Sequence, residues 1–200
     1  MTANIGVVGA GRTGSGIAEI IALAGFDVVL VDAEKQSLNT TLKAIVADLN
    51  QHIASGKLTL IQETAIICHI TTGTDYALLR DCRMCIEAVP ANADMQTDVQ
   101  RKIRTAAPDA IIATNSLTLP IADFASHIAA PDKLVGMIFD FPPQTGANVT
   151  IVSGPQTSES TVDYVTAIVH RLGKAVILGT QDSLTDIKQH LFQTPHIQGC

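Results

Sequence analysis

The 200-residue sequence contains few charged and few aromatic residues. Only 16% of the residues are charged, 4% are aromatic, and tryptophan is absent. The formal net charge is −6, so the chain lacks the basic excess through which proteins bind nucleic acid. Hydrophobic residues make up 46% of the chain, which is too many for a disordered polypeptide. The composition therefore predicts a folded protein with a large apolar core and no nucleic-acid partner.

The sequence also lacks a long apolar run. No stretch approaches the ~18 residues that a membrane-spanning helix requires. A secretory signal would begin with a basic segment followed by an apolar one, whereas this N-terminus leads directly into the apolar residues 4–8. We therefore expect a cytoplasmic protein that does not bind membranes.

Cysteine is scarce, and only one pair has a recognisable spacing. Among four Cys residues, Cys82 and Cys85 form a single C-x-x-C sequence at the start of a predicted strand. A zinc site needs a second pair, and a thioredoxin-like redox site needs a helix start; the sequence has neither. We therefore interpret the pair as ordinary half-buried thiols and expect no metal site.

Segments typical of strands alternate with segments typical of helices along most of the chain. We expect strands over residues 4–8, 27–31, 69–71, 84–89, 110–114, 134–139, 149–152 and 175–178. We expect helices over residues 12–24, 34–53, 93–106 and 121–127, and from 157 or 158 to 173. The strands are continuous apolar runs, as in sheets covered on both faces. This pattern predicts a single α/β domain of the Rossmann type with a doubly wound, mostly parallel sheet.

The sequence changes character after residue 180. We expect residues 1–180 to form the Rossmann domain and residues 181–200 to form a C-terminal helix and tail, with the helix over residues 183–192. Such a helix is a candidate contact for a second copy of the chain, giving a homodimer, or for a partner protein.

The strongest motif is GAGRTG at residues 9–14, which has the G-x-G-x-x-G pattern. It follows a predicted strand and opens a helix, and the next strand ends in Asp32, as in dinucleotide-binding units. Gly9 permits the tight turn, Gly11 lets a pyrophosphate approach the backbone, and Gly14 allows close helix packing. The N-terminus of the helix then offers N–H groups and its positive dipole end to the phosphates.

Asp32 favours one dinucleotide over the other. A carboxylate at this place accepts hydrogen bonds from the adenosine ribose hydroxyls and repels the 2′-phosphate of NADP. We therefore predict NAD as the cofactor. Arg12 can add a charge-assisted contact to the dinucleotide, and Thr13 belongs to the same loop.

Residues 5–32 resemble the NAD-binding domain of the 3-hydroxyacyl-CoA dehydrogenase family. Further similar segments follow in order: GKLT at 56–59, ITTGTD at 70–75, IEAVPAN at 86–92, ATN at 113–115, GM at 136–137, PP at 142–143, LGK at 172–174 and DS at 182–183. The resemblance covers residues 4 to about 183. It implies a cofactor site made of Gly9, Gly11, Arg12, Thr13, Gly14, Asp32, Ala88, Val89 and Asn115.

The resemblance implies a reaction in which an L-3-hydroxyacyl-CoA gives a hydride to NAD while a His removes the hydroxyl proton. In the family a Glu orients that His, and a Ser and an Asn hold the substrate oxygen. A C-terminal helical domain closes the cleft and makes the dimer. The expected small-molecule partners are therefore the dinucleotide and an acyl-CoA or another small molecule.

The sequence departs from the family at these catalytic positions. The His, Asn, Glu and Ser positions carry Ile138, Phe141, Thr150 and Leu117, and an acid and a Lys near the nicotinamide half are replaced by Ala91 and Gln96. The family's D-S-P-G-F run, which leads into the helical domain, corresponds to DSLTD at 182–186, and we expect that domain to be absent. No catalytic residue is therefore assigned by the resemblance.

We predict a NAD(H)-binding protein whose dehydrogenase activity is weak or lost, because Ile138 cannot accept a proton. One alternative is an active oxidoreductase on another substrate, with Asp140 or Thr118 recruited for catalysis. Asp140 is expected on the same strand face as Ile138. A second alternative is a non-enzymatic, NAD-responsive interaction or regulatory module that acts through the C-terminal helix.

Overall fold

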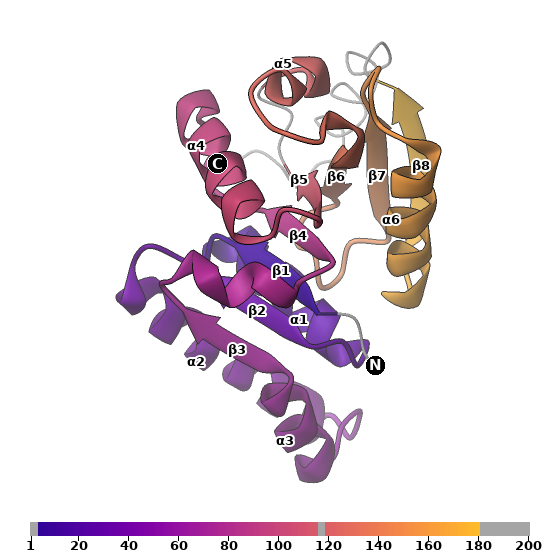
Figure 1. Ribbon diagram of the computed structural model, residues 1–200. Helices are drawn as coiled ribbons and strands as arrows, with labels where there is room; N and C mark the ends of the chain where they lie inside the picture. Colours follow the sequence, from indigo (N-terminus) through magenta and orange to yellow (C-terminus); the bar gives the residue numbers. More distant parts are fainter. Residues whose placement is uncertain (1–3, 116–118, 181–200) are drawn as a thin grey trace.

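The apolar runs of the sequence form one sheet with the strand order β3-β2-β1-β4-β5-β6-β7-β8 (Figure 1). The structure is a computed structural model that describes residues 4–115 and 119–180. The strands are β1 (Ile5–Val8), β2 (Val28–Val31), β3 (Ile70–Gly73), β4 (Met84–Glu87), β5 (Ile111–Thr114), β6 (Leu134–Phe139), β7 (Asn148–Ser153) and β8 (Ala175–Thr180). Each overlaps a predicted strand.

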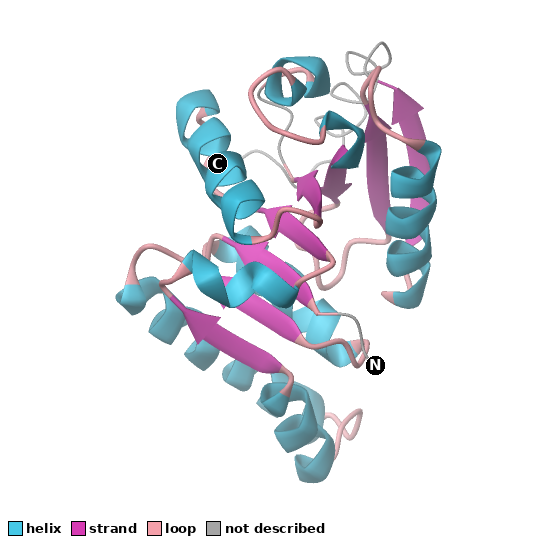
Figure 2. Ribbon diagram, viewed as in Figure 1, coloured by secondary structure: helices cyan, strands magenta, loops and turns pink. Residues whose placement is uncertain are grey.

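Helices connect most of the strands (Figure 2). They are α1 (Arg12–Leu23), α2 (Lys35–Ala54), α3 (Leu60–Cys68), α4 (Ala93–Ala106), α5 (Ile121–Ala125) and α6 (Glu159–Arg171). Two short 3-10 helices, η1 (Tyr76–Asp81) and η2 (Pro131–Lys133), precede β4 and β6.

The strand order places β1 at the point where the sheet stops growing in one direction and begins to grow in the other. From β1 the sheet grows through β2 to β3, and the chain then returns to pair β4 with the other side of β1. Every neighbouring pair is parallel except β6 and β7, which are antiparallel. This confirms the predicted doubly wound, mostly parallel α/β sheet. In such sheets a ligand binds beyond the carboxyl ends of the strands at the reversal point.

Two apolar clusters cover the two faces of the sheet. Adjacent residues of β1 serve different clusters, since Val7 belongs to the cluster under α1, α2 and α6 and Val8 to the cluster under η1, α4 and α5. Ile17 is fully buried in the first cluster, and Ile103 and Phe124 are fully buried in the second. Burial of each such side chain contributes about 1.5–3 kcal/mol. Packing of the two clusters holds the carboxyl ends of the strands, where a ligand would bind, in place.

The sequence pattern did not predict α3 or η1. Thr59 and Gln62 form a capping box at the start of α3, with the Gln62 side chain accepting from the Thr59 N–H at 2.9 Å. The helix has little apolar contact with the sheet, because Leu60 is 66% and Ile61 is 83% exposed. Only Glu63 and Ile66 of α3 are buried. The helix therefore lacks the apolar stripe from which the other helices were predicted.

Both cysteines of the C-x-x-C sequence are buried. Cys82 is 6% exposed and Cys85 is 0% exposed, so the prediction of half-buried thiols was wrong. Cys85 is interior because it lies on β4, which has β1 and β5 on its two sides. The predicted helix over residues 183–192 lies outside the described residues.

Candidate cofactor site

The glycine-rich turn between β1 and α1 allows a very close approach of two backbone segments. Gly9 has a φ of +109°, a conformation that residues with a side chain rarely adopt. Its N–H donates to the Val31 carbonyl at 2.8 Å, which attaches the turn to the end of β2. A Cβ at Gly14 would lie 1.8 Å from the Gly9 oxygen. The first and third glycines of the motif are therefore required by the turn itself.

The N-terminus of α1 opens toward free space. Gly11 is the N-cap residue and provides no side-chain cap, and the first intrahelical hydrogen bond runs from the Ser15 N–H to the Gly11 carbonyl at 2.9 Å. A Cβ at Gly11 would meet no atom within 4 Å. A helix end with open space over its N–H groups suits a phosphate. Gly11, Arg12, Thr13 and Gly14 thus fit the pyrophosphate of a dinucleotide.

Asp32 lies directly beside this turn at the end of β2. Its Oδ2 accepts from the Ala10 N–H at 2.7 Å, and its Oδ1 accepts from the Glu34 N–H at 2.8 Å. The hydroxyl of Thr41 on α2 donates to the Ala10 carbonyl at 2.7 Å and holds the turn from the other side. An ionised carboxylate offers about four acceptor positions, so Asp32 keeps capacity for two ribose hydroxyls.

The end of β4 forms the opposite wall of the turn. The Ala88 N–H donates to the Val8 carbonyl at 2.8 Å, and a Cβ at Gly9 would lie 2.6 Å from the Ala88 oxygen. The Val89 N–H donates to the Glu87 side chain at 3.0 Å. Ala88 and Val89 therefore border the turn across the reversal point, where the resemblance places cofactor contacts.

A buried carboxyl group lies beneath this wall. Glu87 is 0% exposed, and its Oε2 accepts from the Thr114 hydroxyl at 2.6 Å and from the Gln96 amide at 3.3 Å. Burial raises the pKa of Glu87, while its hydrogen-bond donors lower it. Gln96 is a neutral donor at the position where the resemblance implies a Lys. The sequence pattern gave no signal for Glu87, because glutamate at a strand end is normally exposed.

Asn115 connects the ends of three strands. Its N–H donates to the Glu87 carbonyl at 2.8 Å, and its side-chain oxygen accepts from the Phe139 N–H at 3.1 Å. It lies at the carboxyl end of β5, on the side of the sheet where the glycine-rich turn lies. Thr118 and Leu117, the neighbouring candidates, lie outside the described residues.

Ile138 and Thr150 are direct cross-strand partners. They pair between β6 and β7, the antiparallel pair of the sheet, and Thr150 is 3% exposed. Opposed residues of antiparallel strands have Cβ atoms about 4.5–5.5 Å apart. The structure therefore brings together the two positions at which the resemblance implies a His and its orienting Glu.

Asp140 is engaged in the loop that joins β6 to β7. Its Oδ2 accepts from the Asn148 backbone N–H at 3.2 Å and from the Asn148 side chain at 2.8 Å. The Lys174 ammonium donates to the Gly146 carbonyl at 2.5 Å in the same loop. These contacts favour a structural role for Asp140. The guanidinium of Arg12 lies 5.6 Å from the centre of the Phe141 ring, which brings this loop to the glycine-rich turn.

A second buried carboxyl group attaches the loop to α1. Glu19 is 1% exposed and accepts from the Gln144 amide at 3.0 Å. Burial, together with a hydrogen bond to the Asp48 carboxylate on α2, raises the pKa of Glu19 to about 8. No local sequence pattern indicated this contact, because Glu19 and Gln144 are 125 positions apart.

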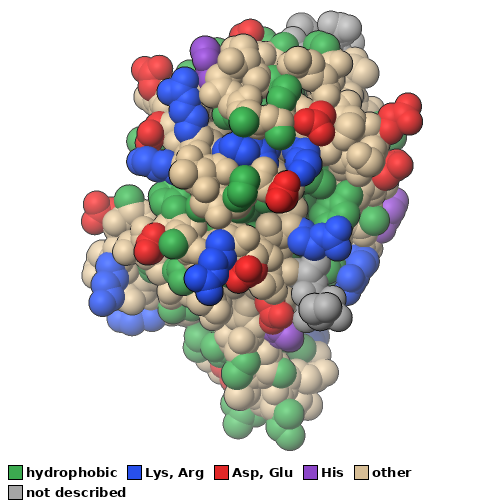
Figure 3. Space-filling view, in the orientation of Figure 1, with side chains coloured by type: hydrophobic (Ala, Val, Ile, Leu, Met, Phe, Trp, Pro, Cys, Tyr) green, Lys and Arg blue, Asp and Glu red, His purple; other side chains and the backbone are tan. Residues whose placement is uncertain are grey.

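The described residues contain no group of three or more His, Cys, Asp or Glu side chains that could hold a metal ion. Among the helices of the described part, none is long and apolar enough to cross a membrane. Figure 3 shows basic and acidic side chains interspersed on the viewed face, with hydrophobic side chains at the lower end, where Figure 1 places α3.

Comparison with known proteins relates the chain to one group of dehydrogenases. Residues 4–183 match the family described as the 3-hydroxyacyl-CoA dehydrogenase, NAD binding domain. A "probable 3-hydroxybutyryl-CoA dehydrogenase" of Deinococcus radiodurans is 34% identical over 170 residues, which cover 84% of this chain and 61% of the relative. The 3-hydroxybutyryl-CoA dehydrogenase of Clostridioides difficile is 30% identical over 174 residues, or 86% of this chain and 62% of the relative.

Solved structures give the same relationship. The (S)-3-hydroxybutyryl-CoA dehydrogenase of Ralstonia eutropha superposes with a TM-score of 0.87 at 30% identity, covering 90% of this chain and 64% of that one. The 3-hydroxybutyryl-CoA dehydrogenase of Escherichia coli K12 also has a TM-score of 0.87, at 25% identity, covering 90% of this chain and 39% of that one. The chain thus spans about three fifths of the length of its curated relatives, at 61% and 62%.

Proposed function

Because the chain belongs to the family of NAD-binding domains of 3-hydroxyacyl-CoA dehydrogenases and takes NAD as its cofactor, we propose that it binds NAD(H) but has weak or no dehydrogenase activity. The observation that carries this proposal is the cross-strand pair of Ile138 and Thr150. It stands where the family resemblance implies the catalytic His and its Glu. Neither side chain can act as a general base near neutral pH.

The cofactor half of the site supports retained binding. Gly11 leaves the helix end open, and Asp32 is fixed beside it by two backbone N–H groups. NAD, when bound, supplies a nicotinamide ring that accepts or donates a hydride. The residues of this chain would hold its phosphates at α1 and its adenosine ribose at Asp32, and Ala88 and Val89 would border it.

The residues at the substrate half of the site support a loss of dehydrogenase activity. Loss of a general base costs about 10²–10⁴-fold in rate. Phe141 occupies the family's Asn position and lies against Arg12 instead of presenting a hydrogen-bonding group. With Leu117 at the Ser position, three groups that would bind or deprotonate a 3-hydroxyacyl substrate are apolar here.

We further propose that residues 1–180 are the NAD-binding unit and that the protein acts in the cytoplasm. An acyl-CoA remains the first small molecule to test, since the curated relatives are named for 3-hydroxybutyryl-CoA. Residues 181–200 are the proposed contact for a second copy or a partner protein.

The proposal is tested by the rate of NADH formation from 3-hydroxybutyryl-CoA. The Clostridioides difficile relative, assayed under the same conditions, is the reference. We expect a rate at least about 100-fold below the reference, as expected for loss of the base. A rate comparable with the reference would refute the proposed loss of activity.

A further inference from the structure

The sulfur atoms of Cys82 and Cys85 both lie against a single glycine of the neighbouring strand, Gly6. Cys82 follows η1, Cys85 lies on β4, and the chain bends at Arg83 between them. A Cβ at Gly6 would lie 2.9 Å from the Cys85 sulfur and 3.5 Å from the Cys82 sulfur. The Cys85 thiol donates a hydrogen bond to the Cys82 sulfur. The bend therefore brings the two sulfurs to the same point beside Gly6 despite their extended surroundings.

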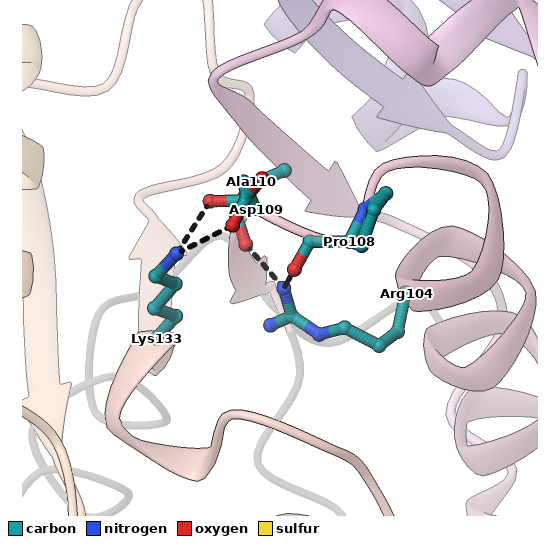
Figure 4. Close-up of polar contacts among 5 residues, drawn as sticks. All are labelled: Arg104, Pro108, Asp109, Ala110 and Lys133. Atoms are coloured by element: carbon teal, nitrogen blue, oxygen red, sulfur yellow. Dashed lines mark hydrogen bonds and ion pairs between the residues drawn. The ribbon is translucent and has the colours of Figure 1, made fainter.

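A buried cation lies close to Cys85. Arg104 is 7% exposed and extends from the last turn of α4 to donate through Nη1 to the carbonyls of Pro108, at 2.8 Å, and Ala110, at 2.7 Å (Figure 4). Its Nε and Nη2 atoms are buried and have no hydrogen-bond partner in the described part of the chain. A guanidinium with unused N–H groups in the interior favours negative charge nearby.

The two thiols differ in acidity. The hydrogen bond from Cys85 lowers the pKa of Cys82. The same bond and burial raise the pKa of Cys85 well above its usual value, and the Arg104 charge acts in the opposite direction. Cys82 is also the more exposed of the two, at 6% against 0%. Cys82 is thus the sulfur that becomes a thiolate and meets a small oxidant first.

We propose that Cys82 and Cys85 are a redox-active dithiol that hydrogen peroxide converts into an intrachain disulfide. The argument rests on the approach of both sulfurs to the same point beside Gly6 and on the slightly greater exposure of Cys82, at 6% against 0% for Cys85. Cys68, at the end of α3, is exposed and would react on its own, so the test removes it.

The reaction balances in two steps. The Cys82 thiolate attacks one oxygen of the peroxide, the O–O bond breaks, and hydroxide leaves, which gives a sulfenic acid on Cys82. The Cys85 sulfur then attacks the Cys82 sulfur, the S–O bond breaks, and the hydroxide takes the Cys85 proton and leaves as water. In total, two thiols are oxidised and one peroxide is reduced to two waters. A dithiol reductant reverses the change.

This site is separate from the cofactor site. Cys82 and Cys85 lie at the amino end of β4, whereas the glycine-rich turn borders Ala88 beyond its carboxyl end. The inference therefore stands independently of the proposed NAD(H) function, and its test uses no cofactor.

The test uses the full chain with Cys68→Ser and Cys200→Ser, so that only the pair remains. The folded protein is treated with peroxide, alkylated in denaturant and digested with trypsin, which cuts after Arg83 between the two cysteines. We expect that neither Cys82 nor Cys85 is alkylated after the treatment. We also expect the peptides 81–83 and 84–101 to be joined, with a combined mass lower by two hydrogen atoms, and to separate on addition of dithiothreitol.

The matched control is Cys85→Ala in the same background, with folding checked by circular dichroism. Its Cys82 should stop at the sulfenic acid, which a 1,3-dione reagent traps. If this variant does not fold, the test rests on whether the protein that keeps both cysteines yields the linked peptides. Oxidation of Cys82 beyond the sulfenic acid with Cys85 still free would overturn the proposal. So would two free thiols after treatment, or a disulfide that forms only in the unfolded chain.

Discussion

Gly11 and Gly14 lie three residues apart in one turn, yet the structure gives them different tasks. A Cβ at Gly14 would collide with the Gly9 oxygen at 1.8 Å, whereas a Cβ at Gly11 would extend into open space. The packing of the turn therefore favours glycine at position 14, whereas at position 11 we propose that glycine serves the approach of a ligand. Two single substitutions separate these tasks.

We expect Gly14→Ala to lower the free energy of unfolding by about 1–3 kcal/mol, as overpacking against the backbone does. Gly11→Ala should leave stability within about 1 kcal/mol, because its φ of −75° suits alanine. The same Gly11→Ala variant should bind NADH more than about tenfold more weakly, a cost of about 1.4 kcal/mol. Urea unfolding and NADH titration of both variants check these expectations. Equal effects on stability would contradict the assignment.

Asp32 provides the second residue-scale prediction. Hydrogen bonds to a charged group contribute about 1.5–3 kcal/mol, so Asp32→Asn should weaken NADH binding by about 10- to 100-fold. Because the 2′-phosphate of NADPH no longer meets a charge, the preference for NADH over NADPH should fall. Parallel titrations with the two nucleotides measure this ratio. An unchanged ratio would show that Asp32 does not select the cofactor.

Glu19 gives a prediction about pH. Its pKa of about 8 in the folded protein lies above the ordinary value of 4.5, so the folded state holds the proton more tightly than the unfolded chain. The resulting stabilisation is complete below pH 4.5 and is lost as the pH rises through about 8. The Glu19→Gln variant cannot ionise and lacks this dependence.

The measurement is urea unfolding of both proteins between about pH 5 and pH 9, where the linkage applies. The free energy of unfolding of the natural chain should fall relative to that of Glu19→Gln by on the order of a few kcal/mol. The other titrating groups are shared, so the difference reports Glu19 together with the Asp48 carboxylate beside it. Two parallel pH profiles would mean that Glu19 ionises normally despite its burial.

At the residue scale, the sequence predicted the parts of the site that are local in the chain. Gly9, Gly11 and Gly14 form one motif, and Asp32 ends the next strand. Contacts between distant residues could not be predicted, because no periodicity pairs Glu19 with Gln144 or Glu87 with Thr114. Such contacts depend on how the strand ends are brought together in space.

At the scale of elements, the β6–β7 loop is held at several points. Asp140 binds Asn148 at its base, Lys174 binds the Gly146 carbonyl, and Gln144 reaches Glu19 on α1. The loop begins at the end of β6 and lies against the glycine-rich turn through Phe141 and Arg12. These contacts make it a fixed wall of the site.

Asp140→Asn and Asn148→Ala test whether Asp140 serves the loop or a reaction. If it serves the loop, Asp140→Asn keeps an amide oxygen that accepts from Asn148 and should change stability little, whereas Asn148→Ala removes the side-chain hydrogen bond and should lower stability by about 1 kcal/mol. NADH binding should be retained in both. If Asp140 were a general base, Asp140→Asn would abolish turnover of a substrate found by screening, while Asn148→Ala would leave turnover largely intact.

The elements themselves were predicted where the apolar pattern was strong. β1, β2 and β4 are continuous apolar runs, and α1 has a buried stripe, so their places followed from periodicity. The helix α3 escaped prediction because Leu60 and Ile61 face outward and break the pattern. Capping by Thr59, a local feature, was the available signal.

At the scale of the whole molecule, strand order separates the two halves of the proposed site. The candidate dinucleotide site lies at the reversal between β1 and β4 and consists of backbone turns and Asp32, whose side chain also holds the turn. The positions at which the resemblance implies the catalytic His and Glu lie on β6 and β7, where Ile138 and Thr150 are a cross-strand pair. Loss of chemistry is therefore compatible with an intact sheet and an intact cofactor site.

The most direct test follows the nicotinamide fluorescence of NADH in one cuvette. Protein is added until the signal saturates, and acetoacetyl-CoA, the oxidised counterpart of the relatives' substrate, is then added. We expect a saturable fluorescence change that Asp32→Ala abolishes and that persists after acetoacetyl-CoA is added. Rapid loss of the NADH signal on that addition would contradict a protein that binds the cofactor without the dehydrogenase reaction.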